Sequence, residues 1–142
     1  MRVVLAPLAA LLIASGCGLI DDPSPNRARL TIDGAAGKTV RLIVSTSFVG
    51  TVNESGQTRL VIIKSDTVQV TLPYTKDYNI EDQQRFFAET ARSAEDVSAL
   101  HMQVFVDSRK QFDETGALLS GSPFRFVYMF NQLVTQDITV VI

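Results

Sequence analysis

Apolar and polar residues alternate along most of the chain beyond residue 28. A spacing of two is typical of strands that bury one face, because successive side chains point to opposite sides of a strand. The pattern therefore predicts strands rather than helices. The positions expected to face inward are Leu30, Ile32, Val40, Leu42, Val44, Phe48, Val68, Val70, Leu72, Leu100, Met102, Val104, Val106, Phe124, Phe126, Tyr128, Phe130, Ile138, Val140 and Ile142.

Three segments depart from simple alternation. Residues 60–63 are apolar on both faces, which predicts a central strand covered on both sides. Residues 85–89 are a weaker strand candidate, and residues 93–99 are the one candidate for a short helix, with Ser93 as its cap. Pro73 removes a ladder donor, so we expect it to stop a strand or confine it to an edge.

The pattern predicts an all-β fold: a single antiparallel β-sandwich of about seven to eight strands over residues 29–142. Residues 33–37 contain two glycines and are interpreted as a hairpin loop. An immunoglobulin-like architecture is compatible with this strand count. The cysteine pair and core tryptophan of immunoglobulin domains are absent, so any likeness would be one of architecture only.

The N-terminus has the three parts of a secretory signal: a positive start at Met1-Arg2, an apolar run over residues 3–14, and small residues at 14–16. The only cysteine, Cys17, follows directly. This segment resembles the signal of a bacterial lipoprotein. The resemblance implies that residues 1–16 are removed and that Cys17 becomes the lipid-bearing first residue. Residues 17–28, with two prolines, are then the lipidated cysteine and an extended linker.

Two other interpretations of the N-terminus remain, a transmembrane anchor and a secreted protein with a free thiol. The apolar run is far shorter than the roughly 20 residues that span a bilayer. Under any of them a single cysteine forms no disulfide within the chain. Gly18 stands where an aspartate retains lipoproteins at the inner membrane of some bacteria. The expected location is therefore the cell envelope, at the outer membrane rather than the inner one.

Charge and residue types limit the chemistry. A net charge of −2 argues against a nucleic-acid partner, and one histidine with one cysteine cannot form a zinc site. Asp107 and residues 113–116 offer oxygen ligands for calcium, but their spacing favours an acidic hairpin turn. His101 is the only histidine that could activate the nucleophile of a hydrolase, and Ser98 and Asp107 are nearby in sequence. Its place in a strand favours a solvated position on the outer face. We expect no metal and no cofactor.

Binding residues are sparse in this sequence. Tyr74 and Tyr78 lie in what is interpreted as a loop over residues 73–82, and they are the candidates for an aromatic ligand-binding surface. The absence of tryptophan weakens a carbohydrate platform. Asn53 formally matches an N-glycosylation site, which a bacterial source would make a chance match. Asn53 is then a turn residue.

The favoured hypothesis is a non-enzymatic, membrane-anchored envelope lipoprotein whose sandwich is a binding or structural module for an envelope protein or glycan. The alternatives are a carbohydrate- or substrate-capturing lipoprotein and a small hydrolase. At the C-terminus, Ile138, Val140 and Ile142 predict a strand built into the sheet, since an exposed apolar edge invites aggregation.

Overall fold

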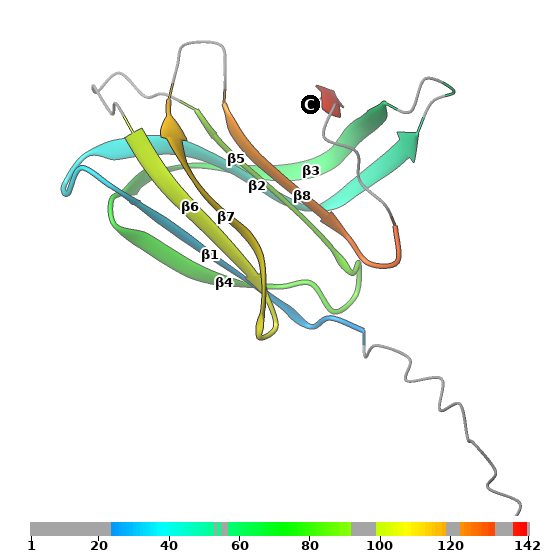
Figure 1. Cartoon of the computed structure of the whole chain (residues 1–142). Coiled ribbons are helices and arrows are strands. Elements are labelled where there is room, and N and C mark those ends of the chain that lie inside the picture. Colours follow the sequence, from blue (N-terminus) through cyan, green and yellow to red (C-terminus); the bar gives the residue numbers. More distant parts are fainter. Residues whose placement is uncertain are drawn as a thin grey trace, which may run out of the picture.

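The computed structural model describes residues 24–52, 54, 57–91, 99–118, 123–132 and 138–141. Within these residues the secondary structure is entirely strands and turns, which confirms the all-β prediction (Figure 1). The strands are β1 (Arg27–Gly34), β2 (Thr39–Val52), β3 (Thr58–Thr71), β4 (Tyr74–Asn79), β5 (Arg85–Ala91), β6 (Ala99–Val106), β7 (Arg109–Ala117), β8 (Phe124–Met129) and β9 (Ile138–Val141).

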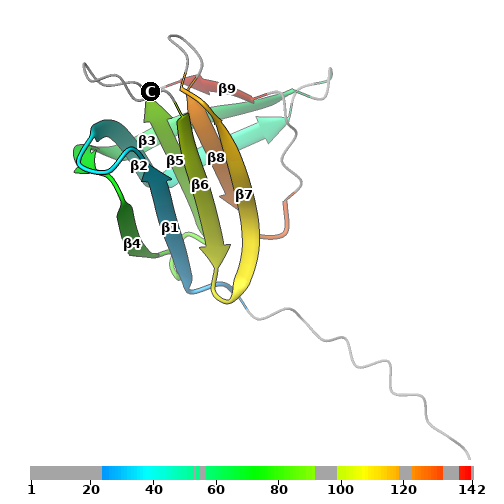
Figure 2. The same ribbon diagram turned by 60° about the vertical axis from the view of Figure 1, so that its left-hand side comes forward.

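The strands form two packed sheets, so the predicted β-sandwich is confirmed. One sheet has four strands in the order β4-β1-β6-β7, and the other has five in the order β8-β5-β2-β3-β9. Neighbouring strands are antiparallel except β3 and β9, which run parallel. Figure 2 shows the four-stranded sheet in front of the five-stranded one, with the start of β1 at the lower end and β9 at the upper end.

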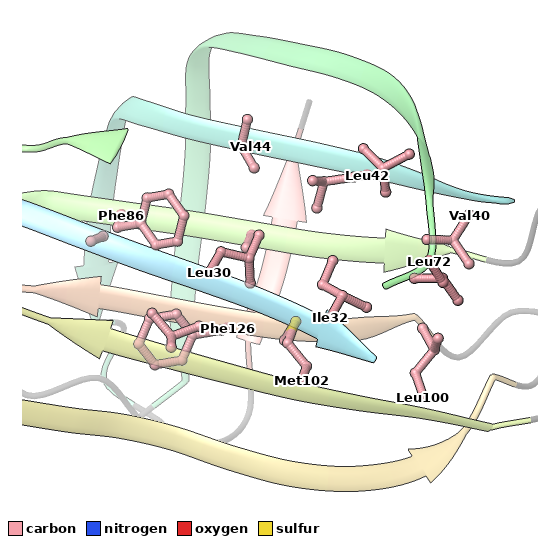
Figure 3. Packing of buried hydrophobic residues seen from close by; sticks show 14 of the residues in the cluster. Leu30, Ile32, Val40, Leu42, Val44, Leu72, Phe86, Leu100, Met102 and Phe126 are labelled. Carbon is pink, nitrogen blue, oxygen red and sulfur yellow. The ribbon is translucent and has the colours of Figure 1, made fainter. Parts of the chain in front are cut away.

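The main core lies between the two sheets, and the alternating residues supply it. Leu30 and Ile32 of β1 and Met102 of β6 are fully buried against side chains of the opposite sheet (Figure 3). Phe86 and Leu42 are among those opposite side chains, also with no exposed surface. Each large aliphatic or aromatic side chain buried in this way contributes about 1.5–3 kcal/mol to folding, which is what holds a chain without disulfides together.

A second core lies on the other face of the five-stranded sheet. β2 pairs with β5 only over Arg41–Ser45, and its ladder to β3 shifts register between Val44 and Phe48. Beyond that bulge the β2–β3 hairpin bends away and passes behind β5 and β8 (Figure 2). Together with β9 it covers Phe87, which is completely buried there. The other buried members of this second core are Ile43, Phe48, Leu60, Ile62 and Met129.

The prediction of a central strand at residues 60–63 is wrong, because the strand covered on both faces is β5. Phe86 faces the main core and Phe87 the second core, whereas Val61 and Ile63 are 43% and 67% exposed. The hairpin that carries Val61 and Ile63 forms the outermost layer, so only one of its faces has a partner. Residues 58–64 and 67–72, interpreted as two strands, are parts of one long strand, β3.

Two further expectations are corrected. Residues 33–37 do not close a hairpin, because β1 and β2 belong to different sheets and this turn links them; Gly37 has φ +78°, as expected for glycine in a turn. Residues 113–116 lie inside β7 and not in a hairpin turn. Gly116 has a packing role there, since a Cβ would come within 2.6 Å of the Phe124 ring. The helix candidate at 93–99 falls largely outside the described residues.

Candidate functional site

A cleft of about 390 Å³ opens at the end of the sandwich where β1 begins. Its walls come from the β6–β7 turn, the start of β7 and the end of β8. β7 and β8 are edge strands, one in each sheet. Pro25, just before β1, also lines it. Polar residues of the β6–β7 turn and of the turn after β8 lie on its rim.

Asp107 fixes one rim of the cleft. It sits in the β6–β7 turn with φ +52°, a left-handed conformation that aspartate tolerates better than most residues. Its carboxylate accepts hydrogen bonds from the backbone N–H groups of Asn26 and Arg27, at 3.2 and 3.1 Å. Its own N–H donates to the carbonyl of Arg27 at 2.8 Å. The turn therefore holds the point at which the chain enters the sandwich.

The opposite rim is braced by backbone hydrogen bonds between two turns. The N–H of Phe130 donates to the carbonyl of Gln84 at 2.9 Å, and Gln84 in turn donates to Ile80 at 2.6 Å. Gln84 and Asn131 both have left-handed backbones, with φ of 51° and 57°. These contacts keep the end of β8 in place, so the shape of the cleft is set before any ligand arrives.

The lining of the cleft combines hydrogen-bonding and aromatic groups. Ser108, Arg109, Gln111 and Asn131 contribute a hydroxyl, a guanidinium and two amides, and Tyr128 and Phe130 contribute rings. A small number of polar groups beside aromatic surface is typical of sites for small polar ligands, hydroxyl-rich ones included. No pattern in the sequence predicted this site. Its residues lie far apart in the chain, and the only local signal is the turn at Asp107-Ser108 between two strands.

Tyr74 and Tyr78 are not in a loop, so that part of the prediction is wrong. Both belong to β4, an edge strand, and both rings pack against the main core. Their hydroxyl oxygens lie 3.0 Å apart, and the Tyr78 ring packs on Phe86 with 5.1 Å between centroids. Burial, the hydrogen bond with Tyr74 and the negative charge of Asp66 raise the pKa of Tyr78 above its ordinary value. The two rings are half-buried and primarily support the core.

His101 lies on the outer face of the four-stranded sheet, in a network of carboxylate and amide groups. Its Nε2 is 2.7 Å from Asp113, and its Nδ1 is 3.9 Å from Asp33. Asp113 also accepts hydrogen bonds from Gln103 at 3.1 Å and Lys110 at 2.5 Å. Hydrogen bonds from Lys110, His101 and Gln103 hold the pKa of the Asp113 carboxyl well below its usual range. This network joins β1, β6 and β7 across their solvent-facing side.

The structure does not bring together the proposed hydrolase groups. Asp107 lies six residues beyond His101 near the far end of β6, about 20 Å away at about 3.4 Å per residue. Its carboxylate is engaged by the backbone of residues 26 and 27. Ser98 falls outside the described residues, as do Cys17 and Asn53.

Neither a metal-binding cluster nor a membrane-spanning helix is present in the described residues. They contain no group of three or more histidine, cysteine, aspartate or glutamate side chains placed to hold a metal ion. Nor does this part of the chain contain a helix long and apolar enough to cross a bilayer. Comparison of the chain with protein-family models, curated proteins and solved structures finds no match.

Proposed function

We propose that this chain is a lipid-anchored protein of the bacterial cell envelope, at the outer membrane, and that its β-sandwich binds or supports another envelope component without catalysis. The signal-like segment ending at Cys17 supports the anchor. Two or three acyl chains on that cysteine would hold the protein stably on the membrane, whereas a single acyl chain would not. The β-sandwich is the part of the chain that would contact the other envelope component.

The attachment of β1 carries this proposal. Asp107 fastens Asn26 and Arg27 to the β6–β7 turn, so the rigid domain begins where the linker ends. The linker over residues 18–26 reaches only about 27 Å when stretched at about 3 Å per residue. The tethered end, with its cleft, is therefore held near the membrane surface. β9 lies at the opposite end of the sandwich (Figure 2). Under this proposal that end faces away from the membrane.

Lipidation is tested by growing the native bacterium with an alkyne-tagged palmitate and detecting label on the protein. The wild-type chain is expected to be labelled and to sediment with membranes, and Cys17→Ser is expected to lose both properties. The matched control is Cys17→Ser combined with Ser24→Cys, which keeps one cysteine but moves it out of the signal. Label on this control, or unlabelled soluble wild-type protein, would contradict the proposal. Density-gradient separation then distinguishes outer from inner membrane.

The cleft supports a second candidate function, the capture of a carbohydrate or other hydroxyl-rich substrate. Its amide, guanidinium and aromatic lining favours this over Tyr74 and Tyr78, whose rings pack against the core. Binding to an array of bacterial envelope glycans is expected to weaken at least about tenfold in Gln111→Ala and Asn131→Gly. Glycine keeps the left-handed backbone of position 131. Gln69→Ala, on an exposed part of β3, is the control, and an equal loss there would argue against the cleft.

A further inference from the structure

Among the described residues, the outer edge of β3 has no neighbour over much of its length. β9 pairs with β3 only from Thr58 to Val61, and no other described strand pairs with that side of β3. From Ile62 to Thr71 the strand therefore has described neighbours only on its β2 side. An unpaired strand edge carries rows of N–H and C=O groups that can pair with another strand. Val68 on this edge is also 41% exposed.

The backbone groups that face outward can be assigned from one contact. The carbonyl of Lys64 accepts a hydrogen bond from the Ser45 hydroxyl of β2 at 2.6 Å, so the peptide groups of Lys64 face β2. The ladder of β3 with β2 is irregular between Lys64 and Ile62, so alternation is carried from Lys64 only toward Thr67. Because these groups alternate along a regular strand, those of Ser65 and Thr67 face the open edge. An added antiparallel strand would form its hydrogen bonds with these two residues.

Two opposite charges flank the middle of this edge. Lys64 and Asp66 are exposed, lie on one face of the strand at a spacing of two, and have no ion-pair partner among the described residues. Two copies of the chain could pair antiparallel along this edge about a two-fold axis. An axis through Ser65 places Lys64 of each copy opposite Asp66 of the other. An axis through Lys64 would place lysine on lysine, and one through Asp66 would place aspartate on aspartate. Opposite charges directly across an antiparallel pair are stabilising, and like charges are destabilising.

We propose that two copies of this chain associate through the open edge of β3, antiparallel about a two-fold axis at Ser65. The pairing extends over residues 62–68, beyond the described ladder of β9 with β3. It covers Val68 with Ile62 of the other copy and forms two Lys64–Asp66 pairs. The five-stranded sheets of the two copies become one continuous sheet. This association is independent of the lipid anchor and of the cleft.

The test is disulfide trapping in the full chain, purified in a nonionic detergent, with Cys17→Ser so that each introduced cysteine is the only thiol. Ser65→Cys places two cysteines at the axis, where paired residues have Cα atoms about 5.5 Å apart, within disulfide reach. Thr71→Cys is the matched control on the same strand, and its two copies would lie about 40 Å apart at about 3.4 Å per residue. Mild oxidation should trap a covalent dimer of the first variant and leave the second monomeric.

Charge exchange tests the register. In the Ser65→Cys chain, Lys64→Glu alone or Asp66→Lys alone puts like charges opposite each other and should weaken dimerisation about tenfold. The double variant Lys64→Glu with Asp66→Lys restores opposite charges and should restore trapping. Maleimide labelling rates correct for any change in thiol reactivity. Equal trapping at positions 65 and 71, monomers throughout, or no rescue by the double variant would overturn the proposal.

Discussion

Removing Arg125 should destabilise the fold strongly, because Arg125 neutralises a buried carboxylate. Its Nη2 and Nε atoms donate to one oxygen of Glu89 at 2.6 and 2.8 Å, and the two residues are directly opposite in the β5–β8 ladder. The Glu89 side chain is only 8% exposed. Arg125 Nη1 also donates to the carbonyl of Ile138 at 3.3 Å, which ties β9 to this pair.

The magnitude follows from that burial. In Arg125→Met the methionine retains most of the packing but leaves the Glu89 charge unpaired, a change that typically costs about 3–5 kcal/mol. The chain as a whole is expected to have about 5–15 kcal/mol of stability, so a large part of it would be lost. The double variant Glu89→Leu with Arg125→Met removes both charges. It should lie within about 1.5 kcal/mol of wild type, the lost hydrogen bond to Ile138 being its main cost.

Urea unfolding followed by far-ultraviolet circular dichroism measures these differences by linear extrapolation. Arg29→Met is the control. It breaks a similar cross-strand pair with Asp77, but that pair is exposed, so the change should be much smaller. A loss below about 1 kcal/mol in Arg125→Met, or a double variant as unstable as the single one, would refute the reasoning.

Four further outcomes are expected. Thr90→Val should stabilise the chain by about 1 kcal/mol in the same urea assay, because the buried Thr90 hydroxyl has no hydrogen-bond partner among the described residues; a loss of stability would show that the hydroxyl is satisfied. Gly116→Ala should cost about 1–3 kcal/mol, since its Cβ would overlap the Phe124 ring, and an unchanged midpoint would contradict this. Asp113→Asn should reduce the fall in the free energy of unfolding as the pH drops below about 4. The lowered pKa of Asp113 means that its contribution is complete above about pH 4 and is lost as the pH falls further, so an unaltered acid profile would argue against it. Deleting residues 139–142 should lower stability by about 1–2 kcal/mol, because Val140 is only half-buried in the second core; equal melting temperatures would show that β9 contributes nothing.

The prediction of the β-sandwich succeeded where a strand has one apolar face against the main core. Leu30 and Ile32, or Leu100 and Met102, repeat at a spacing of two and are all buried between the sheets. The strands missed by the sequence analysis, β4 and β7, are the two edges of the four-stranded sheet. Edge strands bury little, so their sequences are mostly polar. β4 offers only Tyr74 and Tyr78 to the core, which is too short a pattern to separate a strand from a loop.

The candidate cleft was beyond the reach of local patterns. Pro25, Asp107 and Asn131 line it together, although they lie far apart in the chain. The left-handed backbone of Asp107 and its hydrogen bonds to Asn26 and Arg27 exist only once β1 and β6 have paired. The N-terminal signal, in contrast, is formed by contiguous residues ending at Cys17, so it could be predicted from the sequence. It stays a prediction because it lies outside the described residues.

The alternation of apolar and polar residues is present in the sequence, and it was enough to predict that the chain forms strands and which strand faces point into the main core. Period-two burial is a local property of extended backbone. The bend of the β2–β3 hairpin at Ser45, which covers Phe87, depends on contacts between distant segments. This bend makes β5 the doubly buried strand and leaves Val61 and Ile63 exposed. An apolar residue gains stability from whichever surface covers it, and that surface comes from distant parts of the chain.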